Sequence, residues 1–394
     1  MFCMNCGMQI PDGSKFCPHC GSHTDVVPTA QPGVVGAAST SDAATAVKNA
    51  AREATRSAGN AASKVVDKIN ELAGGSDHVE LKFGNFFDAI FKKHQKGEAD
   101  ELFICGTPST TPSLAHVTRE WPHPWVYSRV FLILLISLVG LYVLTAVFDN
   151  PIGYPGLMFV GALFAPFTVI MFFFETNISR NMSFVRVIEV FFIGGVFSIL
   201  CIYPLGALLP GGDTVDVVPS LITGITEEVA KALLVAFFLS RFGGRHYVLT
   251  GLLIGAAVGA GFAVFETAGY IFVGFASSGT EGMTGTLVSR ALVAAGGHVA
   301  WAAAEGGALA LCDDGAGFKL EHLWSGKFLT FLGISIVLHG LWDMYIPWLD
   351  DVILPFVASP KYPLLIIAIW IVLSVLLHRG IAQINELANT QIRR

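Results

Sequence analysis

Long apolar runs separated by short polar segments fill the chain from residue 126 to residue 380. Each run is long enough to cross a hydrocarbon core of about 30 Å, for which roughly 20 helical residues are needed. Eight of them can be counted, at about 127–148, 155–174, 187–209, 219–240, 248–274, 286–312, 328–347 and 362–379. The pattern therefore predicts an all-α polytopic membrane protein with about eight transmembrane helices.

The composition agrees with this interpretation. Of the 394 residues, 53% are hydrophobic and only 14% are charged, whereas soluble domains typically carry about 25% charged residues. This composition argues against a soluble enzyme and against a disordered or fibrous chain. The formal net charge is −6 and no basic block stands out, so we expect no nucleic-acid partner.

The loops between the runs alternate in charge. Basic residues recur in every second loop and in the C-terminal tail: Arg180, Arg186, Arg241, Arg245, Lys319, Lys327, Arg379, Arg393 and Arg394. Because lysine and arginine favour the cytoplasmic side of short loops, we expect a multi-pass plasma-membrane protein with both termini in the cytoplasm.

Composition also suggests boundaries along the chain. We expect a small zinc ribbon at 1–24, a flexible Ala/Ser-rich linker at 25–76, a juxtamembrane amphipathic segment at 77–125, the eight-helix domain at 126–380 and a cytoplasmic tail at 381–394. Within the linker, basic residues recur at multiples of four, which would align them on one face of a helix. They are Lys48, Arg52, Arg56, Lys64 and Lys68.

Four cysteines near the N-terminus form two pairs with the spacing of a metal site. Cys3 and Cys6 are separated by two residues, as are Cys17 and Cys20, and ten residues lie between the pairs. Four thiolates in two such pairs suit a closed, structural zinc site. Two disulfides are the alternative, but a cytoplasmic terminus is in a reducing environment. The segment resembles the zinc ribbon of many bacterial membrane proteins, and we expect it to contact a cytoplasmic protein.

Ionisable residues interrupt four of the apolar runs. The fourth run carries Glu227, Glu228 and Lys231, the fifth Glu266, the sixth His298 and the seventh His339 and Asp343. Charges inside a membrane are costly, so such residues usually face the protein interior and have partners. Counted from the outer end of each run, the carboxylates and histidines lie roughly 6–18 Å deep at 1.5 Å per residue. We therefore expect them to converge in one layer.

These residue types can activate water. A buried carboxylate can act as a base, and histidine can donate a hydrogen bond to an oxyanion or bind a metal ion. Glu305 lies two turns beyond His298 on the same helical face, and we expect it to be a structural or gating group.

The same residues form four motifs in a fixed order. Glu227-Glu228-x-x-Lys231, Phe262-x3-Glu266, His298 and His339-x3-Asp343 resemble the motifs of the PrsW family of intramembrane proteases, over about residues 120–350. That family is distantly similar to the type II CAAX prenyl endopeptidases, whose first two motifs are EExxxR and FxxxH. Lys231 and Glu266 depart from those motifs and favour the PrsW family.

The resemblance implies roles for the individual residues. Glu227 and Glu228 would be the water-activating carboxylate and its partner. Glu266, His298, His339 and Asp343 would complete the catalytic site, with Lys231 and Phe262 in support. A zinc ion bound by a His/His/Glu set and a glutamate mechanism without metal both remain open.

The resemblance also implies an activity. The domain at 126–380 would be an intramembrane endopeptidase in a bacterial plasma membrane, acting on a membrane-anchored protein such as an anti-sigma factor. The alternative is a proton-coupled transporter or a non-catalytic membrane scaffold, since both also use buried Glu, His and Asp residues. The sequence contains no obvious inverted repeat, which is a common feature of transporters.

The ribbon prediction can be checked by metal analysis. A fragment covering residues 1–24, purified under reducing conditions, should bind zinc through Cys3, Cys6, Cys17 and Cys20, and Cys17→Ser should abolish tight binding. Two disulfides and no bound zinc, measured by mass spectrometry, would contradict the prediction.

Overall fold

The structure, a computed structural model, describes residues 9, 11, 40–95, 97–117, 120–209, 214–243, 245–352 and 359–392. It divides into two compact units, Met1–Asn60 and Ala61–Arg394. The cysteines of the predicted ribbon lie outside the described residues. Helix α1 (Thr40–Leu72) occupies most of the predicted linker.

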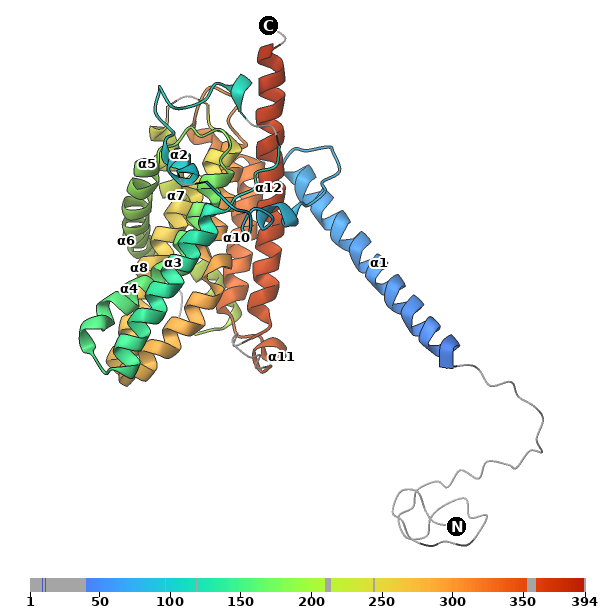
Figure 1. Cartoon of the computed structure of the whole chain (residues 1–394), viewed down its shortest axis with the longest axis vertical. Coiled ribbons are helices and arrows are strands. Elements are labelled where there is room, and N and C mark those ends of the chain that lie inside the picture. The colour runs from blue at the N-terminus through green and yellow to red at the C-terminus, as the bar shows by residue number, and fades with distance from the viewer. Residues whose placement is uncertain are drawn as a thin grey trace, which may run out of the picture. The chain divides into compact units, whose positions relative to one another are not determined.

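In the second unit the described residues form helices joined by loops, with no strand among them (Figure 1). Short α2 (Glu98–Phe103) precedes the other helices of this unit. These are α3 (Val126–Tyr142), α4 (Tyr154–Thr176), α5 (Phe184–Glu189), α6 (Gly195–Leu208), α7 (Val217–Arg241), α8 (Val248–Val293), α9 (His298–Ala310), α10 (Gly326–Asp343), α11 (Pro347–Asp350) and α12 (Lys361–Ile392). A π-helical turn extends α3 to Val147, and another joins α5 to α6.

Five helical segments in the described part of the chain are long and apolar enough to cross a membrane. They are Val126–Val147, Pro151–Thr176, Phe184–Leu208, Val248–Ala310 and Lys361–Thr390. The predicted all-α class with several spans is therefore confirmed, but the count of eight is not. Helix α7 coincides with the fourth predicted run, and its own Glu227, Glu228 and Lys231 reduce its apolarity.

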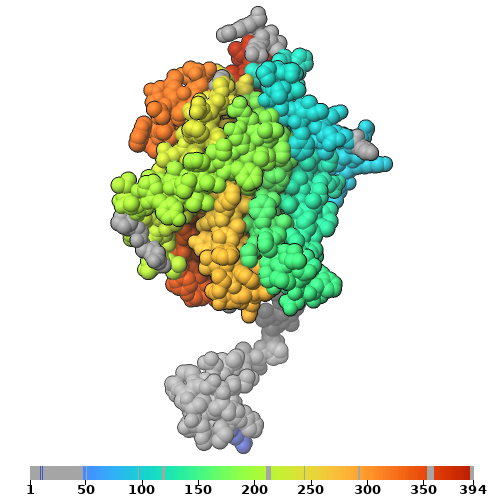
Figure 2. All heavy atoms as spheres, turned by 90° about the vertical axis from the view of Figure 1, so that its left-hand side faces the viewer, coloured from blue at the N-terminus to red at the C-terminus, as the bar shows by residue number. Residues whose placement is uncertain are grey.

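Large apolar side chains lie exposed on the outside of this unit. Ile133 and Ile136 of α3 and Phe197 and Leu200 of α6 are examples, and Figure 2 shows the face on which these helices lie. Exposure of so many large apolar side chains to water is unfavourable, so this face is suited to contact lipid.

The sixth predicted run differs from a continuous helix. Helix α8 reverses direction at Ser278 and Gly279, where the backbone is non-helical and Gly279 has a φ of +62°. The returning half ends at Val293, and a 3₁₀ turn at Ala294–Gly296 precedes α9. The prediction of one uninterrupted run at 286–312 is therefore corrected, because the break places His298 in the first turn of a new helix.

Helices α8 and α9 are held at close range by small residues. A Cβ atom on Gly255 would lie only 2.0 Å from the carbonyl oxygen of Ala302, and one on Gly306 would lie 2.2 Å from that of Gly251. Small residues let helix backbones approach each other and pack tightly in membrane proteins. This contact fixes α9, and with it His298, against α8.

A polar contact ties the ends of these two helices together. Asp313 accepts a hydrogen bond from the backbone N–H of His246 at 2.6 Å and lies 2.9 Å from its Nδ1 atom. Asp313 also accepts from the backbone N–H groups of Gly315 and Gly317. Burial raises the pKa of Asp313, but these backbone donors outweigh it and hold the pKa below its ordinary value. The Asp313 carboxylate therefore stays charged and joins the segment before α8 to the loop after α9.

Candidate active site

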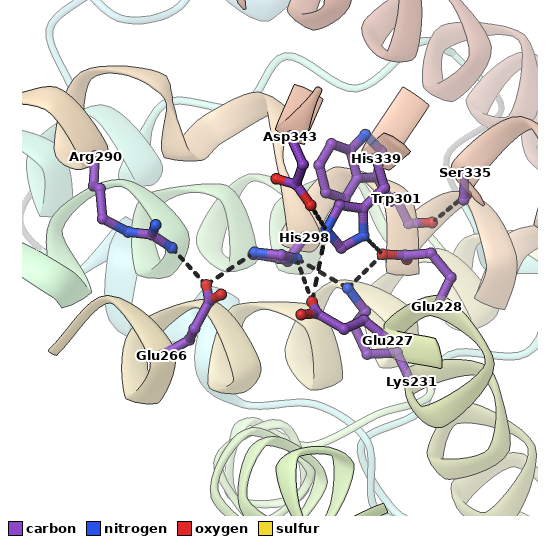
Figure 3. A network of polar contacts seen from close by, with 10 residues as sticks. All are labelled: Glu227, Glu228, Lys231, Glu266, Arg290, His298, Trp301, Ser335, His339 and Asp343. Atoms are coloured by element: carbon purple, nitrogen blue, oxygen red, sulfur yellow. Dashed lines mark hydrogen bonds and ion pairs between the residues drawn. The ribbon is translucent and has the colours of Figure 1, made fainter. Parts of the chain in front are cut away.

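Four helices bring the predicted site residues together, as Figure 3 shows. Helix α7 supplies Glu227, Glu228 and Lys231, α8 supplies Phe262 and Glu266, α9 supplies His298, and α10 supplies His339 and Asp343. Every member of the predicted set contacts at least one other member. The predicted convergence is therefore a feature of the fold.

Glu228 and Lys231 form a completely buried ion pair. Glu228 Oε1 accepts hydrogen bonds from Lys231 Nζ and from His339 Nδ1, each at 2.5 Å. Both side chains of the ion pair are 0% exposed. The Lys231 ammonium also lies 4.6 Å from the centroid of the Phe262 ring, a cation–π distance. These contacts compensate the cost of burying two charges.

His298 connects this ion pair to Glu266. Its Nδ1 atom lies 2.9 Å from Lys231 Nζ, and its Nε2 atom lies 3.0 Å from Glu266 Oε2. Because an ammonium group can only donate, Nδ1 accepts, and Nε2 carries the hydrogen that Glu266 accepts. The neighbours of His298 thereby select one tautomer.

Glu227 lies at the centre of the cluster. Its Oε2 atom is buried and has no hydrogen-bond partner among the residues that the structure describes. That atom lies 3.8 Å from His298 Nδ1 and 3.6 Å from His339 Nε2, and His339 Nε2 lies 3.2 Å from Asp343 Oδ2. Carboxylate oxygens of Glu227 and Asp343 thus both face Nε2 of His339, and a proton or a cation between them would be favoured.

Three of these residues would hold a metal ion once Lys231 withdraws from Nδ1 of His298, whose lone pair it occupies here. Glu227, His298 and His339 each offer one ligand atom, and these atoms lie within 4.8 Å of one another. Two histidines and one glutamate are a known ligand set for catalytic zinc. Histidines that bind zinc usually donate their second ring N–H to a carboxylate, and here Glu266 and Glu228 are in the positions to accept from His298 and His339.

Several residues near the cluster were not predicted as part of the site. Arg290 donates a hydrogen bond to Glu266 Oε2 at 2.5 Å, and the Trp301 ring stacks on His339 with centroids 4.6 Å apart. Arg290 is a basic residue near a loop that is otherwise acidic or neutral. This exception to the charge pattern of the loops could have identified it as a functional residue. The two separate predicted runs imply that the chain reverses between Glu266 and Arg290, but the pattern of apolar residues does not show that these two side chains meet.

A cavity of about 50 Å³ opens beside the cluster, lined in part by Thr267, Arg290, Gly297, His298 and Trp301. This volume accommodates water, since one molecule needs about 10–15 Å³. Three larger cavities, of about 400, 440 and 360 Å³, have none of the predicted catalytic residues in their walls. Water can therefore be held next to His298 inside the helical bundle.

Comparison with known families is consistent with this geometry. A family model described as PrsW family intramembrane metalloprotease matches residues 157–377, and a zinc-ribbon domain model matches residues 2–24. No curated protein and no solved structure matches the chain. The matched helical segment contains all the residues of the cluster, and the two resemblances noted in the sequence are confirmed.

The buried ion pair has a measurable consequence for stability. Lys231→Met should lower the free energy of unfolding by about 3–5 kcal/mol, because it leaves the charge of Glu228 buried without its ammonium partner. Combining it with Glu228→Leu should recover part of that loss. Thermal and denaturant unfolding in detergent would measure both effects, and equal destabilisation by the single and double variants would contradict this account.

Proposed function

This chain belongs to the PrsW family of intramembrane metalloproteases, and from this membership we propose that it hydrolyses a peptide bond with a water molecule activated at Glu227. The observation that carries the proposal is the unpartnered, buried Oε2 atom of Glu227, which faces both His298 and His339. Hydrogen bonds to a carboxylate stabilise its charged form and weaken it as a base. An oxygen without such donors is the better proton acceptor.

The proposed reaction has two proton transfers. Glu227 takes a proton from water while the water oxygen attacks the carbonyl carbon of the substrate peptide bond. The tetrahedral intermediate then collapses, the C–N bond breaks, and Glu227 returns the proton to the leaving amine. The positive charge of Lys231, 2.9 Å from His298 Nδ1, favours the negative charge that develops on the carbonyl oxygen.

The other carboxylates orient the histidines in this proposal. Glu228 holds His339 through Nδ1, and Glu266 holds His298 through Nε2. Arg290 in turn holds Glu266. This division of roles places one base, Glu227, among groups that are already paired and therefore resist rearrangement.

The family description implies a metal ion, and Glu227, His298 and His339 are the residues that would hold zinc. When bound, such an ion would polarise the substrate carbonyl and make the attacking water more acidic. Glu227 would then be a ligand and not the free base, so the zinc mechanism and the mechanism without metal are alternatives, which the chelation experiment below separates. Glu228 and Glu266 would keep the two histidines in the tautomers that ligation requires.

The proposed substrate is a membrane-anchored protein, and an anti-sigma factor in regulated proteolysis is the specific candidate that the family suggests. We place the protein in a bacterial plasma membrane with both termini in the cytoplasm, supported by the basic loops that include Arg186 and Arg241. With the N-terminus in the cytoplasm, the ribbon proposed at 1–24 would lie there too, where a protein partner would bind it.

Replacement of the central residues tests the activity. In proteoliposomes with a membrane-tethered substrate, Glu227→Gln and His339→Ala should each reduce cleavage by at least about 10²-fold, because a positioned acid–base group contributes roughly that much. Glu281→Gln makes the same chemical change at an exposed position of α8 and should keep full activity. Full activity in the first two variants would contradict the proposal, and a proton-linked solute flux would favour a transporter.

Metal removal tests the zinc site. Treatment with 1,10-phenanthroline should abolish cleavage and added zinc should restore it, whereas the non-chelating 1,7 isomer should have no effect. The experiment should use a variant with Cys17→Ser and Cys20→Ser, so that loss of ribbon zinc cannot explain the result. Unchanged activity after chelation would exclude zinc at Glu227, His298 and His339.

A further inference from the structure

The cavity of about 400 Å³ lies apart from the catalytic cluster, between the segment that joins α5 to α6 and the end of α7. Small-molecule sites measure roughly 300–1,000 Å³, so its size is typical of them. On α7, Arg241 in its wall and Lys231 in the catalytic cluster are about 15 Å apart along the axis, at 1.5 Å per residue. The proposed reaction uses none of the residues that line this cavity.

The π-helical turn between α5 and α6 forms part of the wall. It contributes Val190 and Ile193, and the turn itself contacts α7. Single π-helical turns within α-helices are frequent at functional sites. The irregular backbone is therefore a second feature, besides the cavity itself, that points to a ligand here.

Two arginines supply the positive charge of the wall. Arg186 and Arg241 both line the cavity, and neither side chain forms an ion pair or a hydrogen bond with any residue that the structure describes. The Arg241 guanidinium lies 5.5 Å from the centroid of the Phe237 ring. Glu189 is the acidic residue of the same wall, so the wall has one positive charge in excess and two guanidinium groups whose donors are free.

The remaining wall residues are apolar and lie deeper in the membrane domain. The apolar span Phe184–Leu208 begins just before Arg186, and α7 ends at Arg241. Both arginines therefore lie at one membrane surface. Apolar wall residues follow about one or two turns further into the membrane on the same helices. They include Val190, Ile193, Phe237 and Phe238.

We propose that this cavity binds an anionic phospholipid, with its phosphate on Arg186 and Arg241 and an acyl chain along the apolar wall. Guanidinium groups bind phosphate oxygens in pairs of parallel hydrogen bonds, and basic pockets between transmembrane helices bind anionic lipid head groups. One phosphodiester charge balances the excess charge of the wall. In the orientation proposed above, the lipid belongs to the cytoplasmic leaflet, and its binding does not depend on whether the chain is a protease.

Lipid titration of the full-length protein in detergent tests the site. Native mass spectrometry should show saturable binding of dioleoyl phosphatidylglycerol. Dioleoyl phosphatidylcholine, which has the same chains but no net charge, and inorganic phosphate, which has the charge but no chains, should each bind at least about tenfold more weakly. Equal affinity for phosphatidylcholine would overturn the role of the arginines. Equal affinity for inorganic phosphate would overturn the role of the apolar wall.

Replacement of the arginines separates a specific site from general attraction to the membrane surface. Arg186→Gln and Arg241→Gln should each weaken binding of phosphatidylglycerol about tenfold, because each removes a hydrogen bond between charged groups. The double variant should bind it no better than phosphatidylcholine. The control combines Arg129→Gln with Lys327→Gln, which removes the same charge at exposed positions outside the cavity, and it should bind as the wild type does.

Two results would overturn the proposal. One is unchanged binding in the variant with both cavity arginines replaced, and the other is an equal loss in that variant and in the control. Thermal unfolding without added lipid shows whether each variant is folded. If the double variant is not, the two single variants and the comparison of ligands on the wild-type protein decide.

Discussion

The buried ammonium group of Lys231 is the interaction on which the rest of the site depends. It binds Glu228 and His298 directly and lies over Phe262, so that it joins three helices inside an apolar bundle. A cluster of glutamates in that environment would otherwise repel itself and become protonated. One positive charge at this point allows a second carboxylate, Glu227, to remain available as a base, while the histidines keep defined tautomers.

Close packing between α8 and α9 holds that arrangement in place. This packing requires glycine at positions such as Gly255, where a side chain would meet the carbonyl of Ala302. The break before α9 then brings His298 to the depth of Glu227 and Glu266. In a continuous helix, the direction of the His298 side chain would be fixed by the returning half of α8. The break at Ala294–Gly296 removes that constraint.

The sequence predicts the helical class and the members of the catalytic cluster, because a charge inside an apolar run has few explanations besides function. It predicts separate runs at 248–274 and 286–312 and hence a reversal between them, but not the second break at Ala294–Gly296, where small residues look like part of one helix. Arg290 was not predicted as a site residue, because its contact with Glu266 depends on how the side chains of the two halves of α8 meet. Glu305 was recognised as an unusual residue, and the structure shows it fully buried on α9.

The most direct measurement of the central claim is a comparison of membrane-protein fragments, by mass spectrometry of new termini, between cells that contain the wild-type chain and cells that contain Glu227→Gln. The account predicts termini within apolar, membrane-anchored segments that appear only with the wild-type protein. Identical sets of termini in the two strains, with both proteins present at equal levels, would contradict it.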